Sequence, residues 1–456
     1  MNLIVLSGSP KKDLSVTLQS IKYLEIKNPE HNFDYVHIIS QVKEFEKDPS
    51  ALKTLCEKVQ KADVVIWAFS VYHLLVPAHY KRFIELIFEY NLESYFTNKY
   101  TAIFTTSVKY ADNNAHAYMH GICDDLKMNF IDLLSHHMDD LPNKARQQDL
   151  LTFFSEIELF FNEKLTCLPR YNPLKKSQFK YLAGKSGPQV ITDKRIIVIT
   201  DASKEQHNIN EMIRQLEYAA ANNVEVINLN DVSIKGYCLG CCQCGYDNTC
   251  IYRDGYRAFL DYVIETADII IYAGEIKDRY LSSLFKLYHD RSFTFNHVPH
   301  FEGKQFGYLI AGNISNLPNL RQIFEHYHQE TSNLAGIISD EPENCAVIDA
   351  SIYTLLKTAV FFSETDYMRP SNFLGIGGKS VFVEMTKGFT GAIFLADYRY
   401  YKKRNWLSDQ TTLKTKIQNA LMRYFMTRKN FRLEVQKNMT SHMISEHQKV
   451  LRKEIG

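Results

Sequence analysis

Short apolar runs alternate with amphipathic stretches twice along the chain, and this alternation restricts the fold more than any other feature of the sequence. Each half opens on a continuous apolar run, residues 3–6 and residues 196–199. Such runs are typical of strands buried on both faces of a parallel sheet. Each half goes on to five predicted strands that alternate with helices, which indicates two tandem, doubly wound α/β domains. The predicted strands are residues 3–6, 33–38, 63–69, 100–106 and 130–133, then 194–200, 224–229, 267–273, 306–311 and 336–339. The main predicted helices are residues 49–61, 77–90, 114–126 and 150–163, then 256–266, 282–291, 317–334 and 345–363.

The domain boundaries follow from a change in composition between the two halves. Prolines and glycines without a clear period mark residues 166–193 as a linker. We therefore expect a first domain over residues 1–165 and a second over residues 194–365. Residues 366–456 form a C-terminal extension, in which the pattern predicts a hairpin of residues 379–386 with 389–397 and helices over 409–426 and 432–453.

The loop after the first strand has the composition of a phosphate site. Residues 7–17 read S-G-S-P-K-K-D-L-S-V-T and lead directly into a helix. A strand, a small hydroxyl-rich loop and a helix N-terminus can hold a phosphate on backbone N–H groups. The loop is not a Walker motif, because G-x4-G-K-[ST] is absent. An alternative is that Ser15 only caps the helix.

Three parts of the first half resemble the flavodoxin-like NAD(P)H-dependent FMN reductases: residues 8–17, residues 62–72, and Pro77 with residues 81–85. The resemblance implies two flavodoxin-like sheets of strand order 2-1-3-4-5, with FMN bound at the carboxyl ends of the first. By position, the residues implied to hold the phosphate are Ser9, Lys11, Ser15, Val16 and Thr17. Those implied to line the flavin ring are Ser70, Val71, Tyr72 and His73, with Thr106, Ser107 and Tyr110 at its other edge. Ser70 stands where the family most often has proline.

The second half repeats the first loop in a degenerate form. Residues 200–210 align without gaps on residues 7–17, but Asp201 replaces Gly8. A carboxylate at this position repels a phosphate, so we expect FMN in the first domain only. The alternative is that two strand–loop–helix units look alike because the same physics shapes both.

Five of the nine cysteines lie between residues 238 and 250. Cys238, Cys241, Cys244 and Cys250 give C-x2-C-x2-C-x5-C, with Cys242 left over. Four thiolates this close in sequence can converge on one soft metal centre. A [4Fe–4S] cluster, a zinc ion and a loop of reduced cysteines without metal all remain open. The spacing resembles that of the iron–sulfur flavoproteins, in which a [4Fe–4S] cluster lies beside FMN.

The remaining composition sets limits on the function. The net charge of +1 gives no reason to expect nucleic acid as a partner. No run of 18 apolar residues and no secretory signal is found, so we expect a cytoplasmic protein without a membrane partner. The resemblance implies an FMN-dependent NAD(P)H oxidoreductase, which would pass electrons through the cysteine loop to a small-molecule or protein acceptor and needs no catalytic side chain. Alternatives are a non-enzymatic electron carrier, an FMN reductase without metal and a cofactor-free interaction protein. A homo-oligomer formed through the extension is a further expectation.

Overall fold

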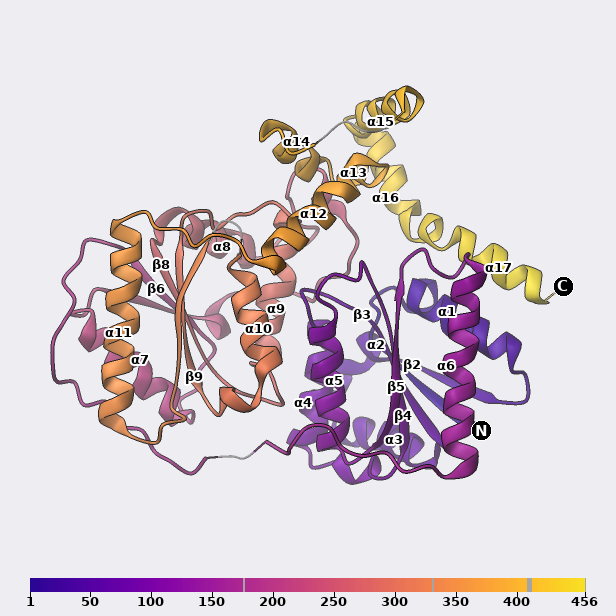
Figure 1. The fold of residues 1–456 in the computed structure, drawn as a ribbon, viewed down its shortest axis with the longest axis horizontal. Helices are drawn as coiled ribbons and strands as arrows, with labels where there is room; N and C mark the ends of the chain where they lie inside the picture. The colour runs from indigo at the N-terminus through magenta and orange to yellow at the C-terminus, as the bar shows by residue number, and fades with distance from the viewer. Residues whose placement is uncertain (175–176, 330–331, 408–411, 456) are drawn as a thin grey trace. The chain divides into compact units, whose positions relative to one another are not determined.

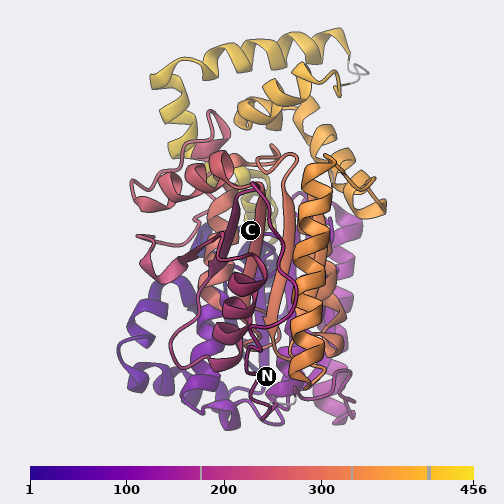
Figure 2. The same cartoon turned by 90° about the vertical axis from the view of Figure 1, so that its left-hand side faces the viewer.

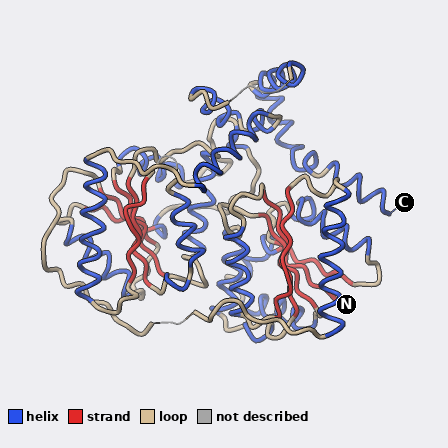
Figure 3. Tube along the Cα trace, viewed as in Figure 1, coloured by secondary structure: helices blue, strands red, loops and turns tan. Residues whose placement is uncertain are grey.

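The computed structural model describes residues 1–174, 177–329, 332–407 and 412–455. The chain divides into two bodies that do not follow the sequence in order. The first body contains residues 1–173, 237–241 and 427–456, and the second contains residues 174–236 and 242–426. In each body a parallel sheet lies between two layers of helices (Figure 3).

The first body is built on a five-stranded parallel sheet of order β2-β1-β3-β4-β5, which confirms the predicted order. The strands are β1 (Asn2–Ser7), β2 (Asn32–His37), β3 (Val64–Ser70), β4 (Tyr100–Ser107) and β5 (Asn129–His137). In the central strand β3 every residue except Ser70 is buried. This is why its sequence, V-V-I-W-A-F, reads as a continuous apolar run rather than an alternating one.

Helices cover both faces of the first sheet (Figure 1). On one face, α1 (Val16–Lys27) and α6 (Lys144–Glu163) share a core with Leu3 and Val5 of β1. The helices α4 (Ala78–Glu89) and α5 (Asn113–Asp125) lie on the other face. Within residues 1–173 the other α-helices are α2 (Ile38–Phe45), which the sequence pattern did not reveal, and α3 (Pro49–Lys61).

The second body repeats this architecture with a sheet of order β10-β9-β8-β6-β7. Counted from its own first strand, this is again the order 2-1-3-4-5. The strands are β6 (Ile196–Thr200), β7 (Val224–Asn228), β8 (Ile269–Glu275), β9 (Gln305–Ala311) and β10 (Asn333–Ser339). The helices α7 (His207–Ala219) and α11 (Cys345–Glu364) pack on one face (Figure 2), and α8 (Gly255–Thr266), α9 (Ser283–Ser292) and α10 (Pro318–Tyr327) complete the body.

The turn after the third strand of the first body has an unusual backbone. Tyr72 and Leu75 exchange two backbone hydrogen bonds of 2.8 and 3.0 Å. Between them, His73 and Leu74 both have positive φ, at 40° and 65°. Two successive non-glycine residues with positive φ are uncommon, because the side chain then crowds the backbone.

The same turn occurs at the same place in the second body. Lys277 and Tyr280 exchange the two backbone hydrogen bonds, and Asp278 and Arg279 have φ of 45° and 64°. None of the four residues matches its counterpart in type. A shared strained turn without a shared sequence favours descent from one duplicated unit over an independent origin of the two sheets.

Two predicted elements are wrong. The predicted helix over residues 317–334 ends at Tyr327, and β10 begins at Asn333, where the Asn333 amide donates to Gln305 Oε1 of β9 at 2.8 Å. Residues 330–331 of that prediction lie outside the described residues. The predicted hairpin of residues 379–397 is helical instead.

In place of the hairpin the extension forms α12 (Phe373–Lys387), α13 (Thr390–Ile393) and α14 (Leu395–Lys403). The buried positions of α12 are Gly375, Gly378, Val383 and Thr386, at helical rather than alternating spacing. Packing of this face overrides the β-branched residues that suggested strands. The chain then continues as α15 (Leu413–Met426), α16 (Lys429–Met443) and α17 (Ser445–Ile455). Residues 409–411 of the predicted helix over 409–426 lie outside the described residues.

Among the described residues, α11 is long and apolar enough to cross a membrane by length and composition. Its place in the fold explains that composition, because Ile348, Ile352, Leu356 and Ala359 are fully buried in the second core. A core helix that covers a parallel sheet is expected to be apolar along one face.

Candidate functional site

Three loops meet at the carboxyl edge of the first sheet, where doubly wound folds bind their ligands. They follow β1, β3 and β4. Three hydroxyl groups join them: Thr17 Oγ1 lies 2.6 Å from Thr106 Oγ1 and 3.3 Å from Ser70 Oγ. These three residues, which the sequence predicted as separate parts of one site, are therefore brought together. The Thr17 side chain is fully buried and holds the start of α1 to the ends of β3 and β4.

The loop after β1 ends in a capped helix. Ser15 is the N-cap of α1, and its Oγ accepts a hydrogen bond of 3.1 Å from the Leu18 N–H. The Gln19 N–H bonds the Ser15 carbonyl at 3.1 Å, so the first intrahelical bond starts there. The amides of Val16 and Thr17 precede it and are the helix donors that an anion can use. The capping role of Ser15 is thus compatible with a phosphate site around it.

Gly8 is the closest-packed position of this loop. Its N–H donates to the Ala68 carbonyl at 2.8 Å, and its own carbonyl accepts from His79 Nε2 at 2.8 Å. A Cβ at Gly8 would lie 2.8 Å from Cδ2 of Tyr80 and 3.0 Å from Cβ of Phe69. The loop therefore has no room for a side chain at this point. Sequence reasoning named Gly8 but missed His79 and Tyr80, for which no local motif exists.

Ser7, the last residue of β1, has a fully buried hydroxyl with no hydrogen-bond partner among the described residues. Strand alternation places Ser7 on the same face as Leu3 and Val5, which pack against α1. An unpaired buried hydroxyl costs about 1–3 kcal/mol, which a bound ligand can recover. The residues of this loop fit an anionic group such as the FMN phosphate.

The other predicted phosphate residues also lie in this loop. Ser9 is buried, and its Oγ is 3.4 Å from the Lys11 backbone nitrogen. The Lys11 ammonium is half-buried and contacts Sδ of Met443 in α16 at 3.3 Å. Met443 is separated from Lys11 by 432 residues, so nothing in the local sequence could have revealed this contact.

The C-terminal helices hold this contact in place. Leu451 of α17 is buried in the core that contains α1 and β1, and Lys27 of α1 forms an ion pair with Glu454. His447, one turn before Leu451, is buried beside Met138 and Asp139 at the end of β5. Burial lowers the pKa of His447, so its imidazole is neutral near pH 7. Residues 427–455 are thus part of the first body and not a separate extension.

The predicted ring-lining residues follow β3 and β4. Val71 donates its N–H to the Thr106 carbonyl at 3.1 Å, which joins the two loops. Val71, Tyr72 and His73 are half-buried. In the loop after β4, Ser107 Oγ donates to Asp112 at 2.9 Å and accepts from the Lys109 N–H at 2.8 Å. The Ser107 hydroxyl therefore shapes the loop, and Tyr110 lies half-buried within it.

A short segment from the middle of the chain, residues 237–241, also belongs to the first body. The Tyr237 ring meets the His79 ring edge-to-face at 5.6 Å, and burial raises the pKa of Tyr237. Gly240 has φ +57°, and a Cβ there would lie 2.2 Å from the Tyr72 hydroxyl. The first part of the cysteine loop therefore packs on the turn that was predicted to line the flavin ring.

In the corresponding loop of the second body, polar groups form hydrogen bonds with neighbouring side chains of the same body. The Asp201 carboxylate accepts from the Ser282 hydroxyl. The Ala202 N–H bonds Thr200 Oγ1 at 3.1 Å, and the Ser203 N–H bonds Gln206 Oε1 at 2.8 Å. Neighbouring side chains thus bond two backbone amides of this loop.

The predicted linker also forms hydrogen bonds with polar side chains of α7. Tyr181 is fully buried in the second core, and its N–H donates to Asn208 Oδ1 at 3.0 Å. Asn208 aligns with Ser15, the helix cap of the first body. Further along α7, Glu211 and Gln215 accept backbone N–H bonds from Ala183 and Lys185 at 3.2 and 2.9 Å. A peptide segment therefore covers part of α7, the counterpart of α1.

The cysteines of this loop are divided between the two bodies. Cys238 and Cys241 belong to the first body, and Cys244 and Cys250 to the second. The buried Cys244 thiol donates to the carbonyl of Phe293 at 3.5 Å and lies 3.4 Å from Asn296 Oδ1. The cluster of four cysteines therefore stays a prediction.

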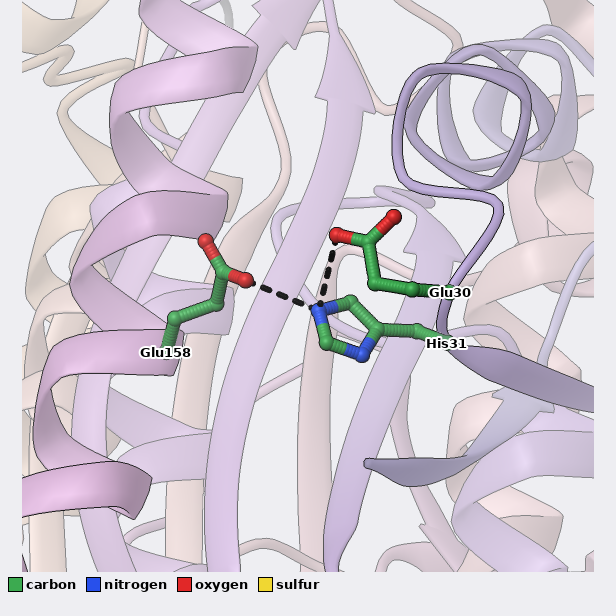
Figure 4. A group of neighbouring side chains, drawn as sticks. All are labelled: Glu30, His31 and Glu158. Carbon is green, nitrogen blue, oxygen red and sulfur yellow. Dashed lines mark hydrogen bonds and ion pairs between the residues drawn. The ribbon is translucent and has the colours of Figure 1, made fainter.

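One group of metal-type side chains does converge within the described residues: the ligand atoms of Glu30, His31 and Glu158 lie within 4.8 Å of one another (Figure 4). His31 Nδ1 accepts from the Met1 amino group at 3.0 Å, so Nε2 carries the proton and donates to Glu158 at 2.8 Å. The group adjoins the start of β2, at the sheet edge opposite the three loops. We interpret it as an ion-paired structural contact.

Comparison with known proteins agrees with this geometry. Residues 1–138 match the family model of the NADPH-dependent FMN reductases. The matched stretch runs from the start of the chain to the end of β5 and so contains all three loops of the site. No curated protein is similar to the chain at a significant level.

Solved structures are similar to a part of the chain. The general stress protein 14 of Treponema denticola, solved with FMN, is 10% identical, with 35% of this chain and 98% of that chain covered and a TM-score of 0.29. An apo NADH:FMN oxidoreductase is 15% identical, with 37% and 91% covered and a TM-score of 0.30. An FMN-dependent NADH-azoreductase of Bacillus anthracis, in complex with FMN, is 10% identical, with 36% and 98% covered and a TM-score of 0.27.

We predict that Gly240→Ala destabilises the first body, because alanine is strained at φ +57° and its Cβ overlaps the Tyr72 hydroxyl. The two effects together cost about 1–3 kcal/mol in the free energy of unfolding, measured by urea titration. Adding Tyr72→Phe removes the overlapping atom and should restore part of the loss. Gly187→Ala is the control, since Gly187 has φ +95° but nothing within 4 Å of a Cβ. Equal losses with and without Tyr72→Phe would contradict the packing of residues 237–241 on this turn.

Proposed function

We propose that the first body binds FMN and catalyses its reduction by NAD(P)H. The observation that carries the proposal is the loop after β1, in which a buried Ser7 hydroxyl without a described partner adjoins a glycine with no room for a side chain. This loop lies within the residues that match the NADPH-dependent FMN reductases. The second body lacks these features, because Asp201 and the linker segment occupy the corresponding positions.

Each residue has a distinct role in this proposal. The phosphate is held by Ser9, Lys11 and the amides of Val16 and Thr17, while Ser15 caps the helix that presents those amides. The Thr17 hydroxyl is fixed to Ser70 and Thr106, so Thr17 contributes its amide and positions the loops. The flavin ring is lined by Val71, Tyr72 and His73, with Ser70, Thr106, Ser107 and Tyr110 around it.

Bound FMN supplies the redox chemistry, since it accepts a hydride from the nicotinamide and passes electrons to an acceptor. The chain binds and orients the flavin, and no side chain has to give or take a proton for the hydride step. The acceptor, a small molecule or a protein, stays a prediction, as does the homo-oligomer.

We predict that the purified chain binds one FMN, and that NADPH added without oxygen bleaches the flavin absorbance near the usual visible maximum. Gly8→Asp should abolish flavin binding because the side chain has no space and its charge opposes the phosphate. Asp201→Gly, the matched change in the second body, should leave one FMN per chain. Bound flavin that NADPH leaves oxidised would support a non-enzymatic electron carrier, and absence of flavin from the wild-type protein would overturn the function.

We also predict that Met443→Glu weakens FMN binding by at least tenfold, because the new carboxylate pairs with Lys11 and repels the phosphate. Riboflavin has no phosphate, so its dissociation constant should stay within about twofold. Both constants are measured by quenching of flavin fluorescence. Ser441→Glu adds the same charge at an exposed position of α16 and is the control. An equal effect on FMN and riboflavin would mean that Met443 supports the fold and not the phosphate loop.

The cysteine loop is assigned no step in this function. The [4Fe–4S] cluster stays a prediction, tested by measuring iron and acid-labile sulfide on protein prepared without oxygen. If the cluster is present, serine at Cys238, Cys241, Cys244 or Cys250 should abolish its absorbance, whereas Cys242→Ser should retain it. Zinc, or no metal at all, would overturn the cluster.

A further inference from the structure

The helix α15 turns an apolar face outward. On its opposite face α15 packs against the rest of the second body. Asn419 and Met426 are buried there, and the Asn419 amide donates to the Lys387 carbonyl at 3.0 Å. The Arg423 guanidinium lies over the Tyr398 ring at 4.0 Å. These contacts fix which side of α15 faces solvent.

The outward side carries large hydrophobic residues at helical spacing. Leu413, Ile417 and Leu421 follow one another at intervals of four residues and are 73%, 53% and 52% exposed. Tyr424 and Phe425 extend this face and are 53% and 44% exposed. Several large apolar side chains gathered on one exposed helix face are unusual for a surface that contacts only water.

The charges along this part of the chain have one sign. Lys414, Lys416 and Arg423 lie within α15, and none of its residues is acidic. The sequence continues with Arg428, Lys429 and Arg432, and the first acidic residue is Glu434. Over residues 412–433 there are thus six basic and no acidic residues, although the whole chain has a net charge of only +1.

On the helix, the basic side chains flank the apolar face. At 100° per residue, Leu413, Ile417 and Leu421 occupy one sector of α15. Lys416 and Arg423 border that sector on one side and Lys414 on the other. An outward apolar face with cations along its borders is the arrangement of helices that lie in the interface of a membrane.

We propose that α15 docks the protein on an anionic lipid surface, with Leu413, Ile417 and Leu421 inserted among the headgroups. A second copy of the chain is a poorer occupant, because it would bring the same basic residues against those of the first copy. Anionic headgroups supply the complementary charge, and each basic residue near such a surface contributes about fivefold to the partition constant.

The helix lies on the membrane and does not cross it. Its 14 residues span roughly 21 Å, which is shorter than the hydrocarbon core of about 30 Å. The proposal keeps the expectation from the sequence that no segment crosses a membrane, but it departs from the expectation that the protein has no membrane partner. Docking of this kind depends on the apolar face and weakens as the salt concentration rises. Added salt screens the charges, because it shortens the Debye length from about 10 Å at 0.1 M to about 3 Å at 1 M.

The test is cosedimentation of the full-length protein with large unilamellar vesicles of phosphatidylcholine alone and of phosphatidylcholine with 30% phosphatidylglycerol. We expect binding to the anionic vesicles at 0.1 M salt, with at least tenfold weaker binding to the neutral ones and at 1 M salt. Ile417→Asp and the double variant Lys414→Glu/Lys416→Glu should each reduce binding at least tenfold. Ile191→Asp, at an isoleucine of the second body that is 79% exposed, is the matched control and should bind as the wild type does.

Three results would overturn the proposal: no binding to anionic vesicles, equal binding to both compositions, or equal loss in Ile417→Asp and Ile191→Asp. Sedimentation velocity of the same variants identifies a rival occupant, because a smaller sedimenting mass for Ile417→Asp without vesicle binding would assign the face to self-association. Circular dichroism confirms that each variant is folded. None of these three measurements involves flavin, so their outcome is independent of the proposed reductase function.

Discussion

The hydrogen bond of 2.6 Å between the hydroxyls of Thr17 and Thr106 is the contact on which the first body's site depends. A net contribution of about 1 kcal/mol is typical of such a bond, but its position matters more than its strength. It joins the first turn of α1 to the end of β4, and Ser70 at the end of β3 lies within reach of the same hydroxyl. The helix amides, the turn after β3 and the loop after β4 are therefore held in one arrangement. A ligand that bridges the three loops then has little loop entropy left to remove on binding.

The two bodies differ in how the polar groups at the carboxyl edge of the sheet are bonded. In the first, the Ser7 hydroxyl has no partner among the described residues, and we propose that a ligand supplies one. In the second, Gln206 accepts from the Ser203 N–H, and Asn208 accepts from the Tyr181 N–H of the linker segment. Buried polar groups need partners, and in the second body the chain itself provides them.

The sequence allowed prediction of the features that local patterning determines. The apolar run of β3 and the degenerate loop at Asp201 could both be read directly, because strand burial and charge are visible in single segments. The hairpin expected at residues 379–397 failed because its β-branched residues are outweighed by packing of one face of α12, which depends on neighbours far along the chain. Met443 and Gly240 could not be assigned to the site for the same reason: their partners, Lys11 and Tyr72, are distant in sequence and share no motif with them.

The assignment of residues 237–241 and 427–456 to the first body affects the order in which the protein can mature. Residues 1–173 leave the ribosome first, yet Leu451 belongs to their hydrophobic core. At about 5–20 residues per second, the ribosome needs roughly a quarter of a minute to one minute to add the chain between them. Throughout that interval the nascent first sheet exposes the apolar surface that α17 later covers. The body whose residues come first in the sequence is thus completed last.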